Sequence, residues 1–167
     1  MSKAFLRESD LGTVPEPAPL AQVLPAGARN YLTQAGAERL REELTQFVQQ
    51  ERPRLTGSDD PEIQRQLKVL DQRIRYLQQS LATAEIVSPP EHNDGVVRFG
   101  ASVTVEAEDG EVTKYRIVGV DEADFEDSAV SWTSPIARAL LNHRRGDIVR
   151  FKAPAGERRL EILHVEY

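Results

Sequence analysis

Apolar residues recur at helical spacing through the region from residue 33 to residue 85. In its second half they form an unbroken a/d heptad stripe of Ile63, Leu67, Leu70, Ile74, Leu77 and Leu81. In its first half, the residues that fall on one side of a helix are Leu40, Leu44, Phe47, Val48 and Leu55. Thr33 can cap this first helix, and Pro53 predicts a kink in it, because an internal proline removes a backbone hydrogen bond. We therefore expect helices near 34–56 and 61–85.

A short polar stretch, Gly57-Ser58-Asp59-Asp60-Pro61, separates the two helices. Asp60 as a cap and Pro61 at the first helical position make a good helix start. A connection of only about four residues predicts that the helices fold back on each other as an antiparallel coiled-coil hairpin. With about 1.5 Å of rise per residue, each arm extends roughly 34–37 Å, so the apex projects away from the rest of the chain.

From Val87 onward the pattern changes to the period of two that is typical of strands. The expected strands cover 102–106, 112–118, 129–132, 148–153 and 159–167, with a hairpin turn at Asp109-Gly110 and one short helix after Ser134-Pro135. We predict an α+β chain in which a coiled-coil hairpin, residues 31–86, is followed by a compact antiparallel domain, residues 87–167. Residues 1–30 are rich in proline, lack hydrophobic periodicity and predict a flexible tail.

Composition narrows the range of functions. The chain has no cysteine, which excludes disulfides, zinc–cysteine sites and thiol nucleophiles and fits a cytoplasmic protein. No apolar run approaches the length that a membrane span needs. The formal net charge of −6 argues against a protein that wraps duplex DNA. The acidity is concentrated in residues 87–167, where 15 Asp and Glu face 10 Lys and Arg.

Several motifs occur in a specific order: YLT-x-x-G-x-x-x-L, ERP, RIRYL, FGA-x-V, YRIVG-x-DE, SPIARALL, GD, PAGE and EIL-x-V-x-Y. This order resembles that of the bacterial Gre transcript cleavage factors, nearer to GreB than to GreA, over about residues 31–167. The resemblance implies a coiled-coil hairpin on an FKBP-like C-terminal domain, bound at the secondary channel of RNA polymerase. It also implies an accessory factor rather than an enzyme, because the polymerase active centre carries the chemistry.

The resemblance gives the acidic tip a role. In full Gre factors, acidic side chains at the apex help to hold a catalytic Mg²⁺ ion in the polymerase active centre while backtracked RNA is cut near its 3′ end. The candidates here are Asp59, Asp60 and Glu62, with Asp59 and Asp60 as metal ligands only within the polymerase complex. The alternative interpretation is that Asp60 only caps the second helix while Ser58 and Asp59 supply turn chemistry.

Two further sets of residues are candidates for contact with partners. The resemblance places a loop that contacts the polymerase at Trp132, Thr133, Ser134, Pro135, Ile136 and Arg138, although Ser134 and Pro135 also form an ordinary helix start. It also implies an RNA-facing basic side of the hairpin, for which the candidates are Arg52, Arg54, Arg73 and Arg75. A solvated flank of ion pairs, such as Asp71 with Arg75, explains these arginines equally well. We interpret the acids at 121–124 as a solvated loop.

The hairpin differs from that of typical cleavage factors, whose arms are about two turns longer and end in an acidic loop, L-G-D-x-x-x-N-A-D/E-Y. This departure favours a monomeric polymerase-binding factor that modulates elongation or initiation, with no cofactor of its own. Two alternatives stay open. One is a transcript cleavage factor that supports Mg²⁺-dependent hydrolysis by the polymerase, and the other is an FKBP-like peptide-binding or scaffold protein.

Overall fold

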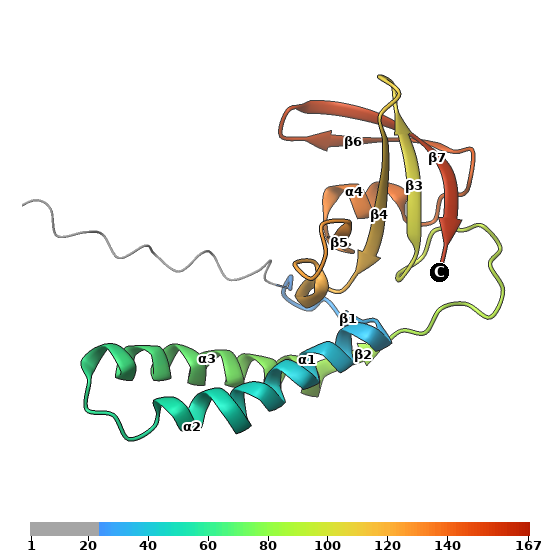
Figure 1. The fold of residues 1–167 in the computed structure, drawn as a ribbon. Coiled ribbons are helices and arrows are strands. Elements are labelled where there is room, and N and C mark those ends of the chain that lie inside the picture. Colours follow the sequence, from blue (N-terminus) through green and yellow to red (C-terminus); the bar gives the residue numbers. More distant parts are fainter. Residues whose placement is uncertain (1–23) are drawn as a thin grey trace, which may run out of the picture.

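The structure is a computed structural model that describes residues 24–167. It consists of a long helical hairpin and a curled five-stranded sheet, which we call the base (Figure 1). Most of the predicted tail, residues 1–23, lies outside the described residues. The α+β prediction is confirmed.

The first arm of the hairpin is helical from residue 34 to residue 55. Helix α1, Gln34–Gln46, passes into a π-helical turn, η1, Phe47–Glu51, and then into α2, Arg52–Leu55. In the wider turn, the N–H of Arg52 donates to the carbonyl of Phe47, five residues back. The interruption expected at Pro53 therefore takes the form of a π turn just before it, a common way to absorb a local misfit in a helix.

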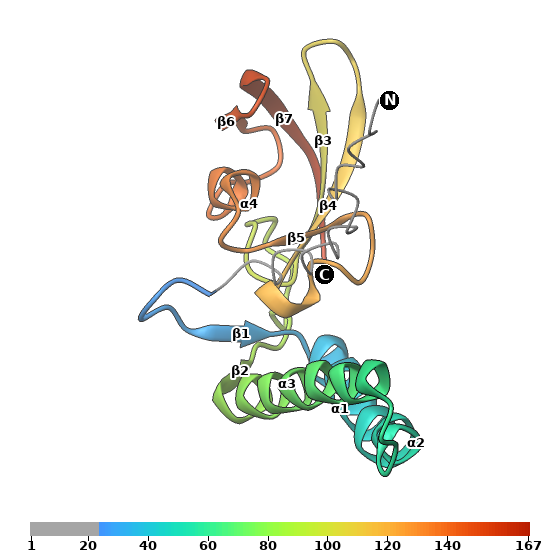
Figure 2. The same ribbon diagram turned by 90° about the vertical axis from the view of Figure 1, so that its left-hand side faces the viewer.

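The second arm, α3, Pro61–Thr83, returns alongside the first (Figures 1 and 2). Leu40 of α1 and Leu77 of α3 are fully buried between the arms, with Leu44, Phe47 and Leu81 packed around them. The predicted seam is thus confirmed, except at Val48, whose side chain is 42% exposed. Val48 follows Phe47 directly, so it faces a different side of the helix, beyond the single stripe that a two-helix hairpin can bury.

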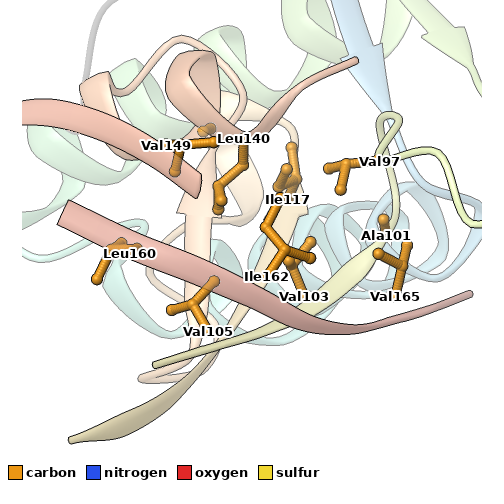
Figure 3. Close-up of a cluster of buried hydrophobic side chains, with 11 residues drawn as sticks. Val97, Ala101, Val103, Val105, Ile117, Leu140, Val149, Leu160, Ile162 and Val165 are labelled. Atoms are coloured by element: carbon orange, nitrogen blue, oxygen red, sulfur yellow. The ribbon is translucent and has the colours of Figure 1, made fainter. Parts of the chain in front are cut away.

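The base is a sheet of strand order β5-β4-β3-β7-β6. The strands are β3 Ser102–Ala107, β4 Val112–Val118, β5 Ala129–Ser131, β6 Ile148–Ala153 and β7 Gly156–Glu166. The short helix α4, Pro135–Leu140, lies against one face of this sheet, and Figure 3 shows the core between them, with Leu140 facing Ile117 and Ile162.

One feature of the base differs from the prediction of an antiparallel domain. Strands β4 and β5 pair in parallel, whereas the other pairs in this sheet are antiparallel. The chain leaves β4 through a 3-10 turn, η2, Val120–Glu122, and a loop, and re-enters the sheet in the same direction. The loop between these strands contacts both arms of the hairpin.

The foot of the hairpin contains a two-stranded parallel pair that sequence patterns did not predict. Strand β1, Asn30–Leu32, pairs with β2, Ala84–Ile86, where we expected the end of the second helix. Asn30 is buried and its Nδ2 donates to the carbonyl of Ser80 at 2.9 Å. Asn30 thus belongs to the foot of the hairpin rather than to the tail.

Candidate functional site

The apex of the hairpin is a tight loop between α2 and α3. Gly57 adopts a positive φ of 89°, which lets the chain reverse. The Oδ1 atom of Asp60 accepts a hydrogen bond from the backbone N–H of Glu62 at 2.8 Å, and Ser58 Oγ accepts one from the N–H of Asp60 at 3.2 Å. Asp60 is therefore the N-cap of α3, and one of its carboxylate oxygens is already engaged.

The other acids at the apex are freer. Asp59 is exposed, and its carboxylate has no hydrogen bond or ion pair to residues 24–167. Glu62 pairs with Arg65 at 3.0 Å in solvent. Within the described part of the chain, no cluster of three or more acidic or histidine side chains could hold a metal. Carboxylate oxygens suit Mg²⁺, but this apex offers only part of its six-ligand shell, and water molecules or the oxygen ligands of a partner would fill the rest.

The predicted RNA-facing arginines divide into two kinds. Arg52 donates to Asp71 at 2.7 Å, and Arg73 donates twice to Glu43 at 3.0 and 3.1 Å; both contacts join the two arms. The Asp71 carboxylate raises the pKa of Arg52 above its ordinary value.

The other two predicted arginines do not join the arms. Arg75 reaches only the backbone carbonyl of Asp71, so the expected side-chain pair of these residues is wrong, because Asp71 faces Arg52 instead. Arg54 is exposed and makes no side-chain contact of this kind with residues 24–167. Of the four predicted RNA-facing arginines, Arg54 and Arg75 are therefore the two whose side chains form no ion pair within residues 24–167.

The predicted contact loop forms the start of α4. Ser134 Oγ accepts from the N–H of Ala137 at 3.3 Å, and Pro135 at the first helical position is exposed. Arg138 is exposed one turn later, while Ala137 and Leu140 face the core. Ser134 and Pro135 thus do form the ordinary helix start, and the same geometry leaves Pro135 and Arg138 open to a partner.

Trp132 is less accessible than Pro135 and Arg138. Its ring lies edge-on to Tyr31, with the ring centroids 5.3 Å apart. Its indole Nε1 is buried and finds no acceptor among residues 24–167. Trp132 therefore links the contact loop to the foot of the hairpin, and most of its ring is not available to a partner.

Glu122, which we expected in a solvated loop, is buried at the joint between base and hairpin. Its side chain is 3% exposed. Oε2 accepts hydrogen bonds from the backbone N–H of Thr33 at 3.0 Å and of Gly119 at 2.9 Å, and Oε1 accepts from the Thr33 hydroxyl. A Cβ atom at Gly36 would overlap this carboxylate, so the first turn of α1 rests directly on it.

Neighbouring residues complete the joint. Asp121 accepts hydrogen bonds from the Tyr76 hydroxyl and from Ser80 Oγ, both on α3. Burial, together with the hydrogen bond to Asp121, raises the pKa of Tyr76 above its ordinary value. The guanidinium of Arg39 lies over the ring of Phe125, 4.2 Å from its centroid. Each arm of the hairpin is therefore bonded to the base by its own contacts. As a result, the tip keeps a defined position relative to the contact loop.

The sequence contains one indication of this contact between the hairpin and the base. Gly36 stands in the first turn of a helix, where glycine weakens the structure unless something packs closely against it. The YLT-x-x-G motif carries both Thr33 and Gly36, and the DE of YRIVG-x-DE carries Asp121 and Glu122. The two motifs lie in contact in the structure, but neither motif alone predicts this contact.

The helices of residues 24–167 include none that is long and apolar enough to cross a membrane.

Known proteins resemble this chain in sequence over most of its length. The family model described as "Transcription elongation factor, GreA/GreB, C-term" matches residues 90–167. The transcription elongation factor GreB of Neisseria meningitidis serogroup B is 38% identical over 155 residues, which cover 83% of this chain and 94% of the relative. GreA of Alkalilimnicola ehrlichii is 39% identical over 152 residues, which cover 81% of this chain and 96% of the relative. Among solved structures, GreA factor homolog 1 (Gfh1) of Thermus thermophilus matches at 28% identity with a TM-score of 0.41, over 84% of this chain and 100% of that one.

Proposed function

The chain belongs to the GreA/GreB family of transcription elongation factors, and on this premise we propose that it binds RNA polymerase at the secondary channel and modulates elongation or initiation. In this proposal the base seats on the rim of the channel and the hairpin enters it. The factor is an accessory protein of the cytoplasm, and any RNA hydrolysis belongs to the polymerase. The observation that carries the proposal is the hairpin with Asp59 exposed at its apex, held by a buried joint to a base that presents Pro135 and Arg138.

The joint supports a rod that delivers its tip to a fixed place. Thr33 at the start of α1 and Tyr76 on α3 are each bonded to the base. Because both arms are fixed to the base, the hairpin loses little further conformational entropy when it enters a channel. A base that binds the rim therefore also determines where the apex stands.

Arm length supports modulation rather than stimulated cleavage. Helix α3 has 23 residues, which at about 1.5 Å each give an arm of about 34 Å. The match to the Neisseria GreB spans 155 positions, whereas 83% of 167 residues is about 139, so the relative carries about 16 positions that this chain lacks. Two helical turns on each of two arms amount to about 14 residues, a number close to the shortening that the resemblance to typical cleavage factors implies. Arms shorter by two turns would leave the tip roughly 10 Å further from the active centre.

The chemistry of the apex also weighs against a metal-holding role. Asp60 already caps α3 with one carboxylate oxygen, which leaves Asp59 as the one acid of the pair whose carboxylate has no hydrogen bond or ion pair to residues 24–167. If the tip did reach a Mg²⁺ ion of the polymerase, Asp59 and the second oxygen of Asp60 would hold it. A bound Mg²⁺ would supply a polarised phosphate and an activated water.

The test combines binding and cleavage. The wild type should bind core RNA polymerase, Pro135→Asn should weaken that binding, and Pro154→Asn, an exposed proline in the turn between β6 and β7, should not. Backtracked complexes incubated with the wild type and Mg²⁺ should release no short RNA fragments above background.

The outcomes separate the candidates. Fragment release that is lost on Asp59→Ala would replace our proposal with the cleavage-factor alternative. A wild type that fails to bind polymerase would refute the polymerase-binding function and favour the peptide-binding or scaffold alternative.

A further inference from the structure

The cations of the base are not distributed evenly. Of its ten Lys and Arg residues, six form ion pairs with acids of the base: Arg98, Lys114, Arg116, Arg150, Arg158 and Arg159. Among residues 87–167, the four with no such pair are Arg138, Arg144, Arg145 and Lys152. Three of these four lie within one eight-residue segment, which begins on α4 and ends in the turn before β6. We call Arg138, Arg144 and Arg145 the arginine ridge.

The acids near the ridge are already engaged. Residues 128–146 contain no Asp or Glu. Asp147 accepts the backbone N–H of Arg144 at 2.8 Å. Asp94, brought close by the bridge between Val96 and Arg144, makes two hydrogen bonds to Arg98 at 2.6 and 2.7 Å, and Arg98 holds the pKa of Asp94 well below its ordinary value. The three ridge guanidiniums are thus exposed and free of intramolecular carboxylates within the described residues.

The backbone under the ridge is well fixed. The N–H of His143 donates to Leu140 at 3.1 Å, its carbonyl accepts from Val97 at 2.8 Å, and the N–H of Gly146 donates to Ile162 at 2.7 Å. These bonds tie the turn to the end of α4, to the segment before β3 and to β7. A partner would therefore meet charges on a preformed surface, which lowers the ordering cost of binding.

We propose that the arginine ridge is a second docking element of the base, which takes an acidic protein surface, a carboxylate-rich patch on RNA polymerase next to the seat of Pro135. This inference rests on the proposed function and names the chemistry of the partner at that seat. Guanidinium groups pair with carboxylates through two parallel hydrogen bonds, which suits a carboxylate-rich partner.

A nucleic acid is the weaker candidate for the same surface. Three arginines are few for binding by phosphate neutralisation, and 15 acids elsewhere on residues 87–167 would repel a phosphate backbone that extended beyond the ridge. A compact acidic patch on a protein could bind the ridge without extending over the acidic parts of the base. Arg138 lies on α4 one turn after Pro135, so one member of the ridge belongs to the proposed protein contact.

The experiment measures binding of the full chain to core RNA polymerase at several salt concentrations. Arg145→Glu is compared with Lys152→Glu, which makes the same charge change at another exposed, unpaired cation of the base. At about 50 mM salt we expect Arg145→Glu to weaken binding about tenfold and the double variant Arg144→Glu/Arg145→Glu to weaken it further, with the difference shrinking towards about 300 mM. Lys152→Glu should stay within about twofold of wild type, and all variants should keep the wild-type melting temperature, since the residues are exposed.

Each other result has a definite meaning. Equal weakening of binding by Arg145→Glu and Lys152→Glu would show only an effect of net charge and would refute the proposed role of the ridge. Binding that neither variant changes would refute it as well. Weakening seen only with polymerase that carries an RNA–DNA scaffold would assign the ridge to nucleic acid and also overturn the proposal. Failure of the wild type to bind any form of polymerase would refute the proposed function itself, and the ridge with it.

Discussion

Replacing Glu122 with alanine should loosen the joint between the hairpin and the base. The change leaves the buried N–H groups of Thr33 and Gly119 without their acceptor. Each buried, unsatisfied donor costs about 1–3 kcal/mol, and water that enters the space left by the side chain recovers part of this. We therefore expect a loss of about 3 kcal/mol in the free energy of unfolding.

Urea unfolding followed by circular dichroism measures this loss, and hydrogen exchange of the Thr33 and Gly119 amides measures it locally. Asp124→Ala is the matched control, because Asp124 is exposed in the same segment and has no side-chain partner among residues 24–167. It should change the free energy of unfolding by no more than about 0.5 kcal/mol.

A second variant tests the same contact from the side of the hairpin. Gly36→Ala should favour the helix by up to about 1 kcal/mol, yet we expect it to destabilise the protein, because the added Cβ overlaps the Glu122 carboxylate. In the Glu122→Ala background the same change should become neutral or stabilising. A loss below about 1 kcal/mol for Glu122→Ala, or the same effect of Gly36→Ala in both backgrounds, would refute the packing described here.

Three further predictions concern the apex and the second arm. Asp60→Ala should lower the free energy of unfolding by about 1 kcal/mol in thermal melts, because it removes the cap of α3, whereas Asp59→Ala should leave it unchanged. Gly57→Ala should cost on the order of 1 kcal/mol in the same melts, since φ is 89° there, and a neutral result would contradict that backbone conformation. Because the pKa of Tyr76 is raised, its contribution to stability is fully present below about pH 10 and is lost as the pH rises through the folded pKa. In an ultraviolet titration of the folded protein, the last phenol to ionise should therefore be absent from Tyr76→Phe, and its persistence in that variant would show that Tyr76 is not the protected group.

The elements of this chain were largely predictable because their signals are local. The heptad stripe from Ile63 to Leu81 specified both the second arm and its buried side, and Asp60-Pro61 marked the point where that arm begins. The strands of the base followed from their alternation, and Ser134-Pro135 marked α4. In each case the residues that carry the signal lie within a few turns of one another.

The features that were missed depend on residues that are distant in the chain. Asn30 in β1 meets the segment after residue 80, and no three-residue strand carries a pattern that would show this. The acids at 121 and 122 look like any polar loop until Thr33 and Tyr76 are brought against them. The charge of these acids suggested that they were exposed to solvent. In the structure, hydrogen-bond donors of both arms surround them, and they connect the hairpin to the base.

In the proposed function, the base seats this factor on RNA polymerase so that the apex of the hairpin lies inside the secondary channel. The chain has no cysteine, so Ser58→Cys gives a single attachment point at the apex for an iron chelate that generates hydroxyl radicals. We predict that the labelled protein, bound to core polymerase, cuts polymerase chains at positions that line the secondary channel, and that Pro135→Asn weakens these cuts in proportion to its loss of binding. Cuts confined to the outer surface of the polymerase, or no localised cuts despite binding, would show that the apex does not enter the channel.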